Sequence, residues 1–78
     1  MWYVYILLCR NGDYYKGCTN NINERFEKHQ KGYVQSTKNN LPVTLISFTA
    51  FIDQQKAFAF EKYLKSGSGR AFSKKHLI

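Results

Sequence analysis

The chain has 78 residues, the size of one small domain, and a domain this short buries only about 60% of the surface of its unfolded chain. Twelve Lys and Arg against five Asp and Glu give a formal charge of +7, which favours a polyanionic partner, nucleic acid before an anionic membrane. The longest apolar run, residues 4–9, is too short to span a membrane, and no leader pattern opens the chain, so we expect a cytoplasmic protein. Cys9 and Cys18 lack the spacing of a zinc site or disulfide framework.

Two strands joined by a turn are predicted at the start of the chain. Residues 2–9 are aromatic, β-branched and aliphatic, which predicts a central strand covered on both faces. Asn11-Gly12 is a favoured hairpin turn sequence, and residues 13–18 predict the returning strand. Gly17 within that strand indicates a bulge or a close approach by another group.

A helix is predicted after the hairpin. Asn20 or Asn21 can cap its start, and the helix should run to about Lys31 and stop at Gly32. Residues 33–40 show no apolar period and predict a polar loop.

A third strand and a second helix follow this loop. Pro42 precedes residues 43–52, whose β-branched and aromatic composition predicts a strand. Asp53 can then cap a helix over residues 54–65.

Glycine and serine mark the end of the second helix. Residues 66–69 predict a helix stop and a flexible linker, and residues 70–78 a basic tail or short terminal helix. The whole order predicts a single α+β domain over residues 1–78: a small three-stranded sheet flanked by helices, β-β-α-β-α with an optional short C-terminal helix.

Two polar residues of the first helix, Arg25 and His29, lie on the flank of the buried stripe that Ile22, Phe26 and Tyr33 are predicted to mark. An unpaired buried charge costs several kcal/mol, so Arg25 needs a partner. A bound phosphate would serve. A carboxylate such as Asp13 would serve equally well, with His29 as a hydrogen-bonded histidine at the core edge.

Glu61 lies at the edge of the apolar stripe of the second helix, where a further apolar residue would be usual. Such a carboxylate is either solvated, ion-paired or a ligand for a hard cation. Mg²⁺ commonly takes one or two protein carboxylates and completes its shell with water and substrate phosphate. Glu61 is the only acidic residue after Asp53, so a metal site here would be sparse.

Tyr5 and Tyr15 depend on the register of the hairpin. A strict two-residue turn places Tyr15 opposite Leu8, with the two phenols on opposite faces of the sheet. A three-residue loop, or a bulge near Gly17, shifts the pairing by one residue and brings both phenols to one face; we predict this shifted register. Alternatively, each tyrosine packs its ring against the protein and exposes its hydroxyl to solvent, as amphipathic strand residues do.

Taken together, two tyrosine triplets and three later polar residues resemble the pattern of the GIY-YIG nuclease family, in its order and approximate spacing: Tyr3-Val4-Tyr5, Tyr15-Lys16-Gly17, Arg25, His29 and Glu61. The resemblance covers nearly the whole chain. More narrowly, it points to the small single-domain bacterial branch related to the cleavage domain of the excision-repair endonuclease. The chain differs from the family pattern at three positions. Tyr3 stands in place of a glycine and Lys16 in place of an isoleucine, and Ser73 stands where members often have an asparagine about a dozen residues after the glutamate.

The resemblance implies a metal-dependent endonuclease that hydrolyses DNA phosphodiester bonds with little sequence preference, in repair or processing of damaged, branched or single-stranded DNA. Glu61 would hold Mg²⁺ or Mn²⁺, and Arg25 would bind the scissile phosphate. Tyr5 would be the general base, with Tyr15 ordering the water or the phosphate. This role requires nearby positive charge to lower the pKa of Tyr5. His29 would accept a proton through the tyrosine or contact the phosphate.

Nucleic acid is the expected partner, DNA rather than RNA, with no membrane, no small-molecule cofactor and room for a partner protein that supplies specificity. Candidate contacts to nucleic acid are Lys16, Gly17, Lys38, Arg70, Lys74 and Lys75. The alternative is a nucleic-acid-binding module on the same fold that cuts weakly or not at all. Phosphate contacts give affinity without sequence information, so the charge supports both hypotheses. Glu61 favours the nuclease, because a pure binder gains nothing from a carboxylate beside phosphates.

Overall fold

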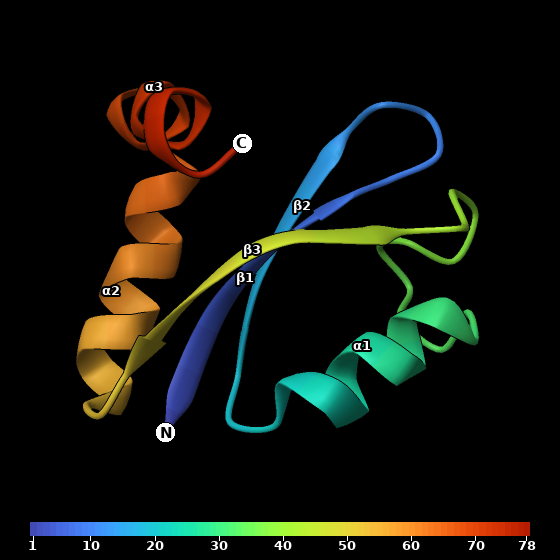
Figure 1. Ribbon diagram of the computed structural model, residues 1–78, viewed down its shortest axis with the longest axis horizontal. Coiled ribbons are helices and arrows are strands. Elements are labelled where there is room, and N and C mark those ends of the chain that lie inside the picture. The colour runs from blue at the N-terminus through green and yellow to red at the C-terminus, as the bar shows by residue number, and fades with distance from the viewer.

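The computed structural model of the chain describes residues 1–78 and shows three strands and three helices. In chain order they are β1 (Trp2–Leu8), β2 (Tyr14–Thr19), α1 (Ile22–Gln30), β3 (Thr44–Phe51), α2 (Gln54–Leu64) and α3 (Gly67–His76). The strands form one antiparallel sheet in the order β2-β1-β3, with α1 on one face and α2 and α3 on the other (Figure 1). The predicted α+β architecture is therefore confirmed. None of the helices has the length and apolar composition that a membrane span requires.

The central strand β1 is buried on both faces, which explains why residues 2–9 lack an alternating pattern. Val4 and Ile6 pack against α2 and α3, while Tyr5 and Leu7 face α1. Fully burying an aliphatic side chain contributes about 1.5–3 kcal/mol, so β1 anchors both layers of the fold.

The hairpin between β1 and β2 has the shifted register. Residues 9–13 form the connection, closed by a hydrogen bond from the Cys9 amide to the Asp13 carbonyl (2.8 Å), with Gly12 at φ +92°. Leu7 pairs with Tyr15, and Tyr5 pairs with Gly17. Directly opposed residues share a face, so Tyr5 and Tyr15 lie on the same face, as predicted.

Side chains cap the helices where the sequence indicates. Asn21 Oδ1 accepts from the Glu24 amide (3.1 Å) at the start of α1, and Gly32, at φ +78°, follows its end. Asp53 Oδ1 accepts from the Gln55 amide (2.8 Å) at the start of α2. Each cap satisfies one backbone donor that the helix leaves unpaired.

The linker prediction for residues 66–69 is wrong, because these residues begin α3. Ser66 is the N-cap, and its Oγ accepts from the Gly69 amide at 3.1 Å. Gly69 is buried against the Tyr63 carbonyl so closely that a Cβ there would collide with it. These residues therefore allow close packing of α3 on α2, and the basic residues that follow are held on an ordered helix.

Candidate active site

The two phenols and His29 form one aromatic cluster between the sheet and α1. Ring centroids are 6.2 Å apart for Tyr5 and Tyr15, 5.7 Å for Tyr5 and His29, and 5.0 Å for Tyr15 and His29. The Tyr5 ring lies across Gly17, where any Cβ would collide with the phenol. The close approach that Gly17 indicated is therefore made by Tyr5, while the irregular pairing in the sheet lies instead between β1 and β3.

His29 is fully buried and is bonded at both ring nitrogens. Its Nε2 lies 2.9 Å from the Tyr5 hydroxyl, and its Nδ1 lies 2.8 Å from Thr37 Oγ1. Burial, with a smaller contribution from the charge of Arg25, lowers the pKa of His29 to about 4, so the ring is neutral at pH 7. A neutral imidazole has one donor and one acceptor: Nδ1–H can donate to Thr37 while Nε2 accepts from Tyr5.

The burial of His29 limits what its ring can contact directly. The ring has no exposed edge with which to contact a phosphate, and its route to the site passes through the Tyr5 hydroxyl. Thr37, buried in the loop after α1, was missed by sequence reasoning, because the loop shows no apolar period that would mark a buried position.

The buried neutral state of His29 predicts a sensitivity to acid. Between pH 6.5 and about 4 the unfolded chain binds the His29 proton and the folded chain does not, so the free energy of unfolding falls as the pH falls. The full loss from this residue is about 3 kcal/mol. Urea unfolding of the native chain and of His29→Gln at pH 7 and pH 4.5 measures it.

The exposed His76 supplies the matched control for this measurement. His76→Gln should lose stability between the two pH values as the native chain does, whereas His29→Gln should lose less. Equal losses in all three proteins would show that His29 does not carry the effect.

Arg25 is half-buried, and no carboxylate pairs with it. The ion pairs of the protein are Lys28–Glu24, Lys31–Glu27 and Lys65–Glu61. The guanidinium lies beside the Tyr5 and Tyr15 hydroxyls, an interaction that raises the pKa of Arg25, and its buried Nε has no hydrogen-bond partner. The alternative pairing with Asp13 is wrong, because that carboxylate accepts from Asn11 instead (3.0 Å).

The expected lowering of the Tyr5 pKa is also wrong. The side chain is 2% exposed, and burial raises its pKa to about 12; the interaction with Arg25 opposes this rise without reversing it. Burial disfavours the charged phenolate more than one neighbouring guanidinium favours it. Tyr5 is therefore a neutral phenol at pH 7 and can accept a proton only while it gives its own away.

Glu61 projects from α2 and forms an ion pair with Lys65 at 3.1 Å. Its side chain is 23% exposed, and its charge contributes to raising the pKa of Tyr5, so it acts on the phenol cluster. An exposed pair one helical turn apart contributes only about 0.3–0.5 kcal/mol, so a stronger ligand can displace Lys65.

The donor set fits a weakly held hard cation. No three His, Cys, Asp or Glu side chains gather anywhere in the chain, so a metal site at Glu61 would have a single anionic side chain as its protein ligand. Mg²⁺ and similar ions accept such a site when water and substrate phosphate complete the shell.

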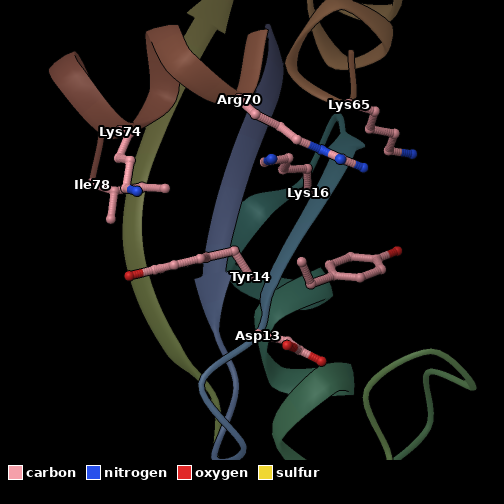
Figure 2. A pocket seen from close by; sticks show the side chains of 8 residues that line it. Asp13, Tyr14, Lys16, Lys65, Arg70, Lys74 and Ile78 are labelled. Atoms are coloured by element: carbon pink, nitrogen blue, oxygen red, sulfur yellow. The ribbon is translucent and has the colours of Figure 1, made fainter. Parts of the chain in front are cut away.

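A groove of about 680 Å³ lies between β2 and the α2–α3 junction (Figure 2). Its lining is mostly basic and aromatic: Asp13, Tyr14, Tyr15, Lys16, Lys65, Arg70, Lys74 and Ile78. Figure 2 shows Lys16, Lys65 and Arg70 gathered toward one end, with Asp13 at the other. Burial, followed by the charges of Arg70 and Lys65, lowers the pKa of Lys16, whose Nζ donates to the Leu64 carbonyl (3.0 Å). A bound anion would relieve this crowding of cations.

The groove gathers only part of the predicted set of nucleic-acid contacts. Lys16, Arg70 and Lys74 line it, whereas Lys38 and Lys75 are exposed elsewhere. Lys65 and Tyr14 were missed, although the spacing of four residues between Glu61 and Lys65 is a recognisable pairing signal. Tyr15 belongs to both the groove and the phenol cluster, so the two are continuous.

Comparison with known proteins identifies the family. The model of the GIY-YIG catalytic domain matches residues 1–75. The chain belongs to the GIY-YIG family. This is a family of nucleases that are generally metal-dependent.

Several GIY-YIG relatives are similar over most of this chain. A UPF0213 protein of Xanthomonas axonopodis pv. citri is 40% identical over 82% of the chain and 64% of its own length. One from Clostridium perfringens is 38% identical over 83% of the chain and 71% of its own length. The solution NMR structure of a UPF0213 protein from Bacillus halodurans superposes with a TM-score of 0.60 and 32% identity, covering 96% of this chain and 82% of that one. The chain thus spans less than two thirds of the Xanthomonas relative.

Proposed function

We propose that the chain is a metal-dependent endonuclease that hydrolyses DNA phosphodiester bonds with little sequence preference. The observation that carries the proposal is Arg25: a half-buried guanidinium without a carboxylate partner, beside two phenols, in a chain of charge +7. Phosphate is the anion that a guanidinium fork binds best through paired hydrogen bonds. Bound there, the phosphate would replace the missing counterion.

The basic groove supports the same substrate. Lys16, Lys65 and Arg70 can bind further phosphates of the strand whose phosphate is held at Arg25, because the groove shares Tyr15 with the cluster. Such contacts fix the strand in place but read no bases, which supports the low sequence preference.

Proton transfer in this proposal runs through Tyr5 to His29. An attacking water loses its proton to the Tyr5 oxygen as the phenol passes its own proton to Nε2 of His29, 2.9 Å away. His29 becomes imidazolium, the water oxygen bonds to phosphorus as the P–O3′ bond breaks, and the released 3′ oxygen takes a proton from solvent. Tyr15 orders the attacking water or the phosphate. Thr37 holds the ring in the tautomer that leaves Nε2 free to accept. A neutral relay of this kind does not need a lowered Tyr5 pKa.

Glu61 would hold the cation, releasing Lys65 to the phosphates. Mg²⁺ or Mn²⁺ bound there would polarise a phosphate oxygen and stabilise the departing 3′ oxygen. Arg25 would offset the charge that grows on the non-bridging oxygens in the transition state.

One observation favours a catalytically weak binding module instead. Ser73 stands where family members often have asparagine, and it is fully buried in α3 with its Oγ unpartnered. It cannot contact a substrate, so this chain replaces the asparagine with no equivalent group.

A plasmid-nicking assay distinguishes the two functions. The native protein should nick supercoiled plasmid with Mg²⁺ or Mn²⁺ and stop in EDTA, because Glu61 alone cannot stabilise the leaving oxygen. Binding to the same DNA, measured by anisotropy in EDTA, should persist and weaken as salt rises. Salt-sensitive binding without nicking in either metal would contradict the nuclease proposal and support the binding module.

A further inference from the structure

An aromatic pair, the half-buried Tyr3 and the exposed Phe48, lies beside the phenol cluster. Tyr3 precedes Tyr5 by two residues on β1, and Phe48 pairs directly with Tyr5 across β1 and β3. All three side chains therefore share the α1 face of the sheet. The Tyr3 and Phe48 ring centroids are 5.7 Å apart at 73°, and Phe48 is 53% exposed.

The fold leaves this part of the sheet uncovered. Helix α1 packs over the part of the face around Leu7 and Leu45, whereas Phe48 and Ala50 remain exposed. A lone exposed apolar residue is ordinary, but a contiguous pair at the edge of a polar site is typical of a contact surface.

The charge of the surroundings selects the occupant. Arg25 and the basic groove favour a polyanion, and the aromatic pair favours a flat apolar group attached to it. A nucleic-acid strand joins both in every nucleotide, and bases stack on aromatic side chains whatever their sequence. An apolar protein partner would meet the rings but would leave the neighbouring cations without counterions.

We propose that Tyr3 and Phe48 stack an unpaired base of the strand whose phosphate lies at Arg25. The proposal rests on the proposed function and narrows its substrate class. A base in a duplex reaches the pair only after unstacking, which costs a few kcal/mol in intact DNA and little in a single strand. The preferred substrate is therefore single-stranded, frayed or gapped nucleic acid.

Binding in EDTA tests the base site without any requirement for cutting. Fluorescence anisotropy compares a short labelled single strand with a duplex of the same sequence, for the native chain and for Phe48→Ala. Phe48→Ala should weaken single-strand binding by about 5- to 150-fold, the fold-change equivalent to ~1–3 kcal/mol per stacked base. Duplex binding should change less than about twofold, since phosphate contacts dominate it. Phe48→Trp should restore single-strand binding.

Phe58 provides a matched control on the opposite face. It is also an exposed phenylalanine in a T-shaped pair, with Trp2 at 5.5 Å, and it lies on α2. Phe58→Ala should bind both probes as the native chain does. The base site is overturned if Phe48→Ala weakens the binding of both probes equally, or if it weakens neither. It is also overturned if the native chain sediments as a dimer that Phe48→Ala dissociates. Failure of the native chain to bind either probe would instead refute the proposed function itself.

Discussion

Glu61→Gln is expected to abolish nicking while leaving DNA binding in EDTA nearly unchanged. The amide keeps the shape of the side chain but removes the anionic oxygen, and no cluster of other ligands can hold the cation in its place. Metal stabilisation of the leaving oxygen contributes several kcal/mol, so the single-turnover rate should fall by ~10³-fold or more. Binding persists because Lys65, freed from its ion pair, remains available for phosphate. Single-turnover nicking with Mg²⁺ and anisotropy in EDTA measure the two effects separately.

Glu27→Gln is the matched control for that substitution. Glu27 also pairs with a lysine four residues later, Lys31 at 2.7 Å, but on the exposed surface of α1. It should nick at the native rate. If Glu61→Gln and Glu27→Gln nick equally, or if Glu61→Gln loses binding along with cutting, the carboxylate has no specific part in cleavage.

The sequence predicted those features of the fold and the site that depend on local chemistry. Caps at Asn21 and Asp53 mark the starts of α1 and α2. Gly17 indicated that something approaches β2 closely, and the shifted hairpin that brings Tyr5 and Tyr15 together follows from the same stretch of chain. The sequence left two registers open, and the shifted one, which we predicted, is the one that forms, because three residues connect Cys9 to Asp13.

Other features depend on contacts that local patterns do not encode. The hydrogen bond between His29 and Thr37 joins a helix to an irregular loop. The raised pKa of Tyr5 depends on how deeply the phenol is buried as well as on the groups around it. Glycine is about 1 kcal/mol less favourable than alanine inside a helix, so helix propensity favoured a linker at Gly69. The close packing of Gly69 on α2 outweighs that cost. The sequence also does not show which basic residues lie together, because the groove forms only when α3 docks beside β2.

Arg25→Lys is expected to lower the single-turnover nicking rate by ~10²–10³-fold with little loss of DNA binding. Lysine keeps the positive charge, which supports binding, but lacks the planar fork that can hold two phosphate oxygens at once. Removing one such donor from a developing oxyanion costs ~10²–10³ in rate.

Arg10→Lys controls for the chemistry of the substitution, since Arg10 is exposed in the hairpin connection and is not part of the phenol cluster. It should nick as the native chain does. The decisive comparison is the ratio of rate to affinity: a phosphate fork at Arg25 predicts a large fall in rate at nearly constant affinity. A fall in affinity that accounts for the whole loss of nicking would make Arg25 a binding residue only, and the phosphate at the phenol cluster would no longer be the one that is cut.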